Sequence, residues 1–270
     1  MLTIDWKERL NMDTADFLKN KLPNGDYDFE IIFIAYPERV NGKIPAEVIY
    51  HVASNIVQQL GKKHDAYIPF YRALWNKKGD YGKLAFAQII SKLLPKKPSV
   101  YLPLLDETLS TASEADINAL LDKVMLPLLR KYPDKYLEKV FHYASSSEPN
   151  LHKAALNLLI KLVKKREDLV PKVMNYFVHQ WLYPLGEYTS IHITMLKTVA
   201  KLNPDYYLKI WQEYGISRDP QIVELLCASI TDYFPGLETP IEVWTKSGNA
   251  RLKKAATTAQ RILIKKKGAV

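Results

Sequence analysis

A short phrase recurs along the chain at nearly constant spacing. Its copies are Tyr67-Ile68-Pro69, Tyr101-Leu102-Pro103, Tyr136-Leu137, Leu169-Val170-Pro171 and Tyr207-Leu208. The first positions of successive copies are separated by 34, 35, 33 and 38 residues. A period of this length is typical of stacked helix-pair units. We therefore expect a fold built from repeated pairs of helices.

The segment that follows each phrase has the pattern of a second, buried helix. Its best example is the apolar series Leu151, Ala154, Ala155, Leu158, Leu159 and Leu162, which recurs at the i, i+3, i+4, i+7 spacing of one helix face. The small residues Ala154 and Ala155 allow a neighbouring helix to approach closely. Before this helix, Ser145, Ser146, Ser147 and Pro149 supply the chemistry of a helix start.

The same pattern predicts the organisation of the whole chain. Helix pairs are expected at about 66–94, 99–131, 134–165, 168–202, 205–233 and 240–266, with a further helix at 47–61. Residues 1–45 are predicted to form an irregular N-terminal cap, 46–266 the helical repeats and 267–270 the end of a basic tail. Residues 29–34 are the one place where a short strand fits. Because no linker rich in Gly or Ser divides the chain, we predict one continuous domain, 1–270.

Composition excludes several classes of protein and site. The first ten residues lack the apolar run of a signal peptide, and no apolar stretch is long enough to span a membrane. A single cysteine, Cys227, excludes an internal disulfide and favours a reducing, cytoplasmic location. The six histidines form no HExxH motif, and no phosphate-binding or dinucleotide-binding loop is present. We therefore expect no metal, no cofactor and no catalytic motif.

The unit over residues 136–162, YLEKVFHYASSSEPNLHKAALNLLIKL, resembles a HEAT or HEAT-like repeat. This resemblance covers roughly residues 66–266. It implies an all-α, right-handed α-solenoid of about six to seven antiparallel helix pairs. Such repeats serve many unrelated functions, so the resemblance predicts a fold rather than an activity.

Residues 133–155 are also similar in layout to the core repeat of the HEAT-like alkylpurine DNA glycosylases. The resemblance places that family's arginine on Lys153, its catalytic aspartate near Asn118 and its upstream tryptophan near Glu114. Asn118 cannot supply the carboxylate that would stabilise positive charge on the sugar. Asp116 is nearby, but two residues away and on a different helical face. Glycosylase activity is therefore an alternative and not the leading prediction.

An excess of basic residues points to a polyanionic partner. The chain has 38 Lys and Arg residues against 29 Asp and Glu, a formal net charge of +9. Nine cations fall on the expected second helices: Lys83, Lys92, Lys153, Lys161, Lys197, Lys201, Arg251, Lys254 and Arg261. Stacked repeats would align them on a basic concave surface that contacts phosphates without reading bases. The alternative is that they are merely the solvated face of each helix.

Aromatic residues suggest a core pattern and two contact positions. The recurring Tyr67, Tyr101, Tyr136 and Tyr207 share one position of the repeat, which favours a role in the core. Trp75 and Trp181 lie at expected helix ends beside turns, where we predict partial exposure and contact with a partner. Taken together, the sequence predicts a binding protein for the nucleic-acid backbone. The alternatives are a protein–protein scaffold that takes an acidic segment, and an alkylpurine DNA glycosylase.

Overall fold

The computed structural model describes residues 5–21 and 29–268, and this part of the chain is helical. Helices account for 78% of the residues, and the described residues form no strand. An isolated bridge joins Val40 and Lys43. The sequence pattern allowed a short strand at 29–34. The structure instead has a 3-10 helix there, Phe29–Phe33, in which Phe29, Ile32 and Phe33 are buried. The all-α prediction is confirmed for the described residues.

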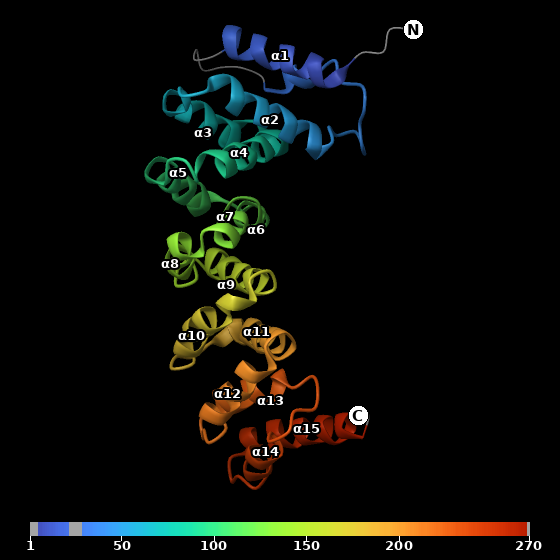
Figure 1. Ribbon diagram of the computed structural model, residues 1–270, viewed down its shortest axis with the longest axis vertical. Helices are drawn as coiled ribbons and strands as arrows, with labels where there is room; N and C mark the ends of the chain where they lie inside the picture. Colours follow the sequence, from blue (N-terminus) through green and yellow to red (C-terminus); the bar gives the residue numbers. More distant parts are fainter. Residues whose placement is uncertain (1–4, 22–28, 269–270) are drawn as a thin grey trace. The chain divides into compact units, whose positions relative to one another are not determined.

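The residues group into two compact units, Met1–Lys131 and Tyr132–Val270 (Figure 1). The division falls between two of the helix pairs that the repeat pattern predicts. We call these the first unit and the second unit and describe each by itself. The prediction of a single continuous domain remains a prediction.

The first unit begins with a long helix, where the sequence was expected to be irregular. Helix α1 spans Trp6–Lys21, so the prediction of an irregular cap over 1–45 is wrong for these residues. Leu10, Thr14 and Phe17 recur at helical spacing and are buried, and α1 packs on α2. Residues 1–4 and 22–28 of the predicted cap lie outside the described residues.

The next three helices of the first unit form one packed group. They are α2 (Ala46–Leu60), α3 (Ile68–Lys77) and α4 (Gly79–Leu93), and α4 packs against both others. The 3-10 turn His64–Tyr67 leads into α3. Gly82 permits the tight turn from α3 to α4, because a Cβ there would overlap the carbonyl oxygen of Leu74.

The first unit ends with a pair whose second helix is interrupted. Helix α5 spans Pro98–Thr111, and the second helix runs as α6 (Glu114–Leu120), a π-helical turn η3 (Leu121–Met125) and α7 (Leu126–Lys131). Pro127 explains the interruption. It has no N–H to donate, and its ring would collide with the carbonyl group of Lys123 in a regular α-helix. The Leu126 N–H instead donates to the carbonyl oxygen of Leu121, five residues back.

The described residues of the second unit form four successive helix pairs. The first helices of the pairs are α8 (Pro133–Tyr143), α10 (Val170–Gln180), α12 (Pro204–Tyr214) and α14 (Glu238–Thr245). The second helices are α9 (Pro149–Val163), α11 (Thr189–Leu202), α13 (Pro220–Ser229) and α15 (Ala250–Lys267). Short 3-10 turns, Glu167–Leu169 and Gly186–Tyr188, precede α10 and α11. The pairs lie where the sequence pattern predicts them.

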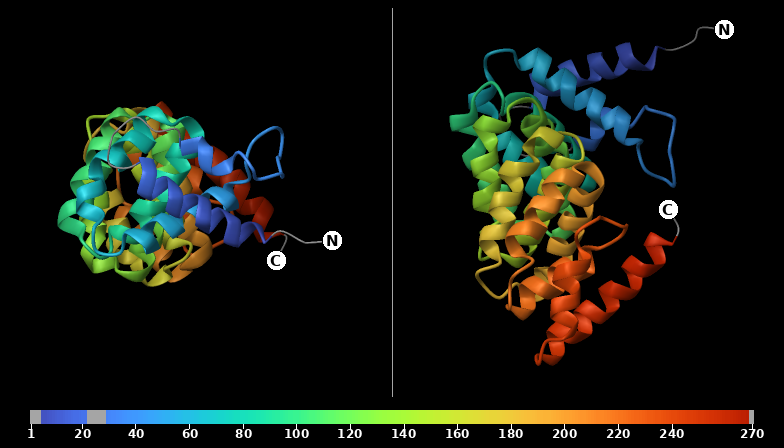
Figure 2. Two further views of the ribbon diagram at one scale, coloured as in Figure 1. Left: turned by 90° about the horizontal axis from the view of Figure 1, so that it is seen from above. Right: turned by 60° about the horizontal axis from the view of Figure 1, so that its bottom comes forward.

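Within the second unit the helices form two rows, which Figure 1 shows side by side. Helices α9, α11, α13 and α15 pack on one another in chain order and form what we call the second-helix row. Helices α8, α10, α12 and α14 form the first-helix row. The right-hand view of Figure 2 shows α15, in red, along its whole length. This helix continues through Lys267, so the basic end of the chain is helical up to that residue, and 269–270 lie outside the described residues.

The recurring phrase marks the core, with one exception. Tyr101, Tyr136 and Tyr207 are at most 1% exposed, and each is the fourth residue of a helix that begins with proline. Tyr67 is only half-buried, because it ends the turn before α3 begins. Tyr71, one helical turn later, is fully buried in its place. The prediction of a core role is therefore confirmed for three of the four tyrosines.

Candidate nucleic-acid interface

Charge is divided unequally between the two rows of the second unit. Glu224 is the only carboxylate residue in the four helices of the second-helix row. The Lys and Arg residues of that row are Lys153, Lys161, Lys197, Lys201, Arg251, Lys253, Lys254, Arg261, Lys265, Lys266 and Lys267. The row therefore has a large positive charge excess, most of it on α15.

The first-helix row has the opposite balance. Its carboxylate residues are Asp134, Glu138, Asp205, Glu213, Glu238 and Glu242. Its only Lys and Arg residues are Lys135, Lys139, Lys172 and Lys209. If the lysines served solubility alone, there would be no reason for one row to contain almost no carboxylates. The unequal division is therefore the observation that marks the second-helix row as a candidate interface.

The nine predicted cations fall in both units. Lys83 and Lys92 lie on α4 of the first unit, where Lys83 is half-buried and Lys92 is exposed. The seven in the second unit are exposed: Lys153, Lys161, Lys197, Lys201, Arg251, Lys254 and Arg261. They come from α9, α11 and α15, whereas α13 contributes no cation. Together they form the candidate interface of the second unit.

The α11 part of this surface follows directly from helix geometry. Ser190, Thr194, Lys197 and Lys201 are exposed and recur at spacings of 4, 3 and 4 residues, while Met195, Leu196 and Val199 are buried. Lys197 and Lys201 form no ion pair with any described residue. Two adjacent ammonium groups on one stripe can therefore both contact phosphate oxygens.

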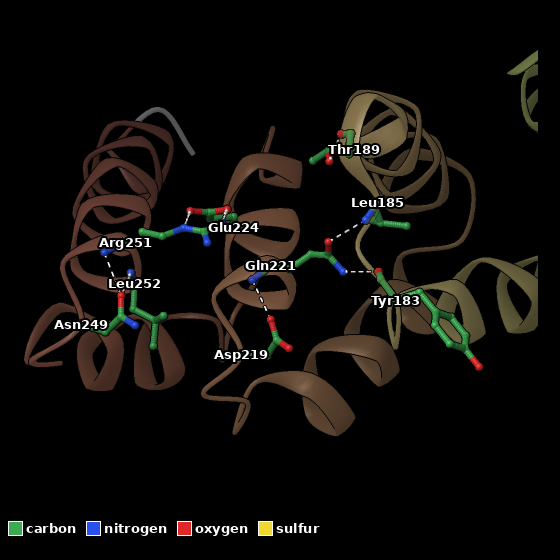
Figure 3. Close-up of polar contacts among 10 residues, drawn as sticks. Tyr183, Leu185, Thr189, Asp219, Gln221, Glu224, Asn249, Arg251 and Leu252 are labelled. Atoms are coloured by element: carbon green, nitrogen blue, oxygen red, sulfur yellow. Dashed lines mark hydrogen bonds and ion pairs between the residues drawn. The ribbon is translucent and has the colours of Figure 1, made fainter. Parts of the chain in front are cut away.

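The single carboxylate of the row neutralises one of its cations. The guanidinium of Arg251, on α15, donates to Glu224, on α13, from Nε (2.8 Å) and from Nη2 (2.6 Å), as Figure 3 shows. This bidentate pair raises the pKa of Arg251. Glu224 therefore offsets the charge of Arg251, one of the seven predicted cations of the second unit. Lys83 is the corresponding case in the first unit, since its Nζ lies 2.6 Å from Oδ2 of Asp116.

Polar caps fix where the helices beside this pair begin (Figure 3). Asp219 accepts from the Gln221 N–H at the start of α13, and Asn249 accepts from the Arg251 and Leu252 N–H groups at the start of α15. The Gln221 side chain accepts from the Leu185 N–H and donates to the Tyr183 carbonyl oxygen, over 2.9 Å each. These bonds tie α13 to the loop before α11, so neighbouring helices of the row are held in register.

The two tryptophans predicted to contact a partner are buried. Trp75 is 7% exposed and Trp181 is 2% exposed, so the expected partial exposure is wrong for both. Trp75 packs on Phe86 of the next helix. Trp181 packs edge-on against Tyr214 and donates from Nε1 to His192. Each indole packs on a residue of another helix, and this contact buries it. Its position at a helix end gave no indication of that contact.

The residues that follow Trp181 are the exposed ones. Leu182 is 72% exposed and Tyr183 is 60% exposed, at the loop between α10 and α11. The predicted exposure is therefore found in this segment, but on Leu182 and Tyr183 and not on Trp181. The available signal was helix phase. Trp181, the C-cap of α10 with helical backbone angles, lies four residues after the buried Phe177 and continues its face. Tyr183 lies two residues further on, in the loop.

The surroundings of Cys227, Asn118 and Asp116 account for these three side chains without catalysis. Burial raises the pKa of the Cys227 thiol to about 12, which disfavours the thiolate. In α6, the Asn118 amide donates to the carbonyl oxygen of Glu114 (2.9 Å). Although burial acts in the opposite direction, hydrogen bonds from Lys83 and Ser113 lower the pKa of Asp116. Asp116 is therefore an ionised partner of Lys83.

The described residues offer neither a metal site nor a membrane segment. They contain no group of three or more His, Cys, Asp or Glu side chains placed to hold a metal ion. Over the same residues, every helix is too short or too polar to cross a bilayer.

In comparisons with known proteins, no family model, no curated protein and no solved structure matches this chain.

Proposed function

We propose that this protein is a HEAT-like, right-handed α-solenoid of about six to seven helix pairs that binds the phosphate backbone of nucleic acid. The observation that carries the proposal is the division of charge in the second unit, where Glu224 is the only carboxylate of the second-helix row. Binding would be electrostatic and largely independent of sequence, because lysines on exposed helix faces contact phosphates and not base edges.

Lys197 and Lys201 provide the sharpest test, because both are exposed and lie on one stripe of α11. Replacing both with Gln should weaken binding to a fluorescein-labelled duplex DNA, measured by anisotropy over a range of salt concentrations. Counterion release gives a log–log slope of about −0.9 per neutralised phosphate, so the slope should become shallower by up to about 2. A matched double variant, Lys135→Gln with Lys209→Gln, removes two exposed lysines from the first-helix row.

This control should change binding much less than the α11 variant. Equal losses in the two double variants would show that net charge, and not the second-helix row, governs binding. Absence of duplex binding by the wild-type protein at low salt would overturn the proposal and favour the protein scaffold. Lys153→Gln with Lys161→Gln extends the test to α9, where we expect a similar loss.

One observation favours a scaffold as the second candidate function. A groove of about 420 Å³ lies between α12 and α14, and its lining includes Trp211, Trp244, Ile216 and Val243. Ile216 is 87% exposed and Val243 is 64% exposed. Arg218 is the charged residue in the lining, so the groove suits an apolar segment that carries a carboxylate. Val243→Asp should abolish binding of an amphipathic acidic peptide in fluorescence polarisation and leave duplex binding unchanged.

Glycosylase activity stays a less favoured alternative. The resemblance places the catalytic carboxylate near Asn118, whose amide bonds within its own helix. We expect no release of alkylated base from duplex DNA. Release that Lys153→Ala abolishes would show that the protein is an enzyme.

A further inference from the structure

A pocket of about 340 Å³ opens in the first unit between α2, α4 and the α6–η3 segment. Apolar groups form much of its wall, among them Ile44, Leu84, Leu120 and the rings of Tyr50 and Trp75. Its volume lies in the range of small-molecule sites, and aromatic walls suit a flat apolar body. The pocket therefore has the size and lining to hold an organic molecule.

Three lysines line the same pocket, and two of them are neutralised. Lys43 Nζ lies 2.9 Å from Asp80 Oδ2, and Lys83 Nζ lies 2.6 Å from Asp116 Oδ2. Lys123 forms no ion pair with any described residue. Its ammonium instead lies 3.7 Å from the centre of the Tyr50 ring. The pocket therefore contains one cation without an acidic partner.

The position of Lys123 depends on a local distortion of its helix. Lys123 is the middle residue of the π-helical turn η3, and Pro127, which cannot donate to the carbonyl group of Lys123, follows two residues after this turn. π-turns inside α-helices are frequently found at functional sites. Lys123 is half-buried, and burial together with the nearby Lys92 lowers the pKa of its ammonium. A partly desolvated cation with no counter-ion is stabilised by an anion that enters the pocket.

We propose that this pocket binds a small organic anion whose flat apolar body lies against Tyr50 and Trp75 and whose carboxylate or phosphate group pairs with Lys123. The site goes beyond the candidate interface of the second unit, which lies on other residues. Its ligand is a free small molecule and not a polymer, because the pocket offers one unpaired ammonium beside apolar side chains and two existing ion pairs.

The test compares matched naphthalene probes by isothermal titration calorimetry. We expect 2-naphthoate and 2-naphthyl phosphate to bind the wild-type protein at least tenfold more tightly than the neutral 2-naphthylmethanol, since a charge-assisted hydrogen bond contributes about 1.5 kcal/mol or more. The two anions distinguish a carboxylate ligand from a phosphate ligand. Equal affinity for the neutral and anionic probes would overturn the proposal without any variant.

Variants then locate the site. Lys123→Gln should lower affinity for the anions about tenfold and leave the alcohol unaffected, whereas Lys123→Arg should retain anion binding. Lys62→Gln, at an exposed lysine outside the lining, is the matched control and should leave the affinity for every probe unchanged.

Ala119 is an exposed residue of the pocket wall, so Ala119→Trp should fill the pocket and abolish binding of all three probes. Anion binding that survives both Lys123→Gln and Ala119→Trp would show that the anions bind elsewhere. Duplex binding is measured separately, so failure of one proposal leaves the other standing.

Discussion

The indole Nε1–H of Trp181 donates a hydrogen bond to Nδ1 of His192 over 3.1 Å, and both side chains are buried. Since Nδ1 accepts, the imidazole is neutral and its proton lies on Nε2. Burial, with a smaller contribution from His152, lowers the pKa of His192 to about 4. This pair therefore fixes the protonation state of a core histidine.

The pair makes stability depend on pH. An unfolded histidine has a pKa of about 6.5, so on acidification the unfolded chain binds the proton before the folded chain does. The contribution of neutral His192 to the free energy of unfolding is thus complete above about pH 6.5 and is lost as the pH falls toward 4. Between pH 7 and pH 5 we expect His192 alone to lower the free energy of unfolding by about 2 kcal/mol, measured by urea denaturation.

His192→Gln should reduce this pH dependence, and His142→Gln, at an exposed position, should not. Unchanged pH dependence in His192→Gln would contradict the assignment.

Removing the one carboxylate of the second-helix row should strengthen polyanion binding. Glu224→Gln releases Arg251 from its bidentate pair and makes its guanidinium available to phosphate. We expect tighter duplex binding and a log–log salt slope steeper by about 1. Glu213→Gln removes an exposed carboxylate from the first-helix row and is the control. The proposed interface would be in the wrong place if the two variants gained equally.

The packing of α9 predicts a strong position effect for a buried charge. Ala155 is fully buried on α9, so Ala155→Asp should destabilise the protein by about 3 kcal/mol or more. Ala228→Asp introduces the same charge at an exposed site of α13 and should cost little. Hydrogen exchange should accelerate most over residues 134–202, because α9 packs on α8, α10 and α11. Uniform acceleration along the chain would argue against this local picture.

The single thiol should report opening of the second unit. Cys227 is 3% exposed, and burial raises its pKa to about 12. Reaction with 5,5′-dithiobis(2-nitrobenzoate) at pH 8 should therefore be slow in the native protein and fast in denaturant. Rapid labelling under native conditions would show that α13 opens readily. Ala155→Asp is expected to accelerate the reaction and Ala228→Asp to leave it nearly unchanged.

Local sequence signals predicted the helices well. Proline in the first turn and apolar residues at helical spacing mark several of the helices, and α8 and α9 begin at Pro133 and Pro149 as this pattern indicates. Helix α1 was missed because its polar composition resembles that of a loop, and its buried Leu10 and Phe17 stand out only once α2 is present to pack on them.

Features that depend on distant residues were not predictable. The burial of Trp181 depends on His192 and Tyr214, which lie on α11 and α12. The pocket around Lys123 likewise depends on contact with Tyr50, which lies 73 positions earlier in the chain. No local sequence pattern predicts such contacts, because they depend on how the helices pack.

The unequal charge of the two helix rows gives the second unit an electric dipole directed across its width. In the field of a polyanion this dipole experiences a torque, which turns the second-helix row toward the polyanion before the surfaces touch. Such pre-orientation increases the fraction of collisions that are productive and thus raises the association rate more than the affinity. At physiological ionic strength the field is screened over about 8 Å, so the turning acts only in the last stage of approach.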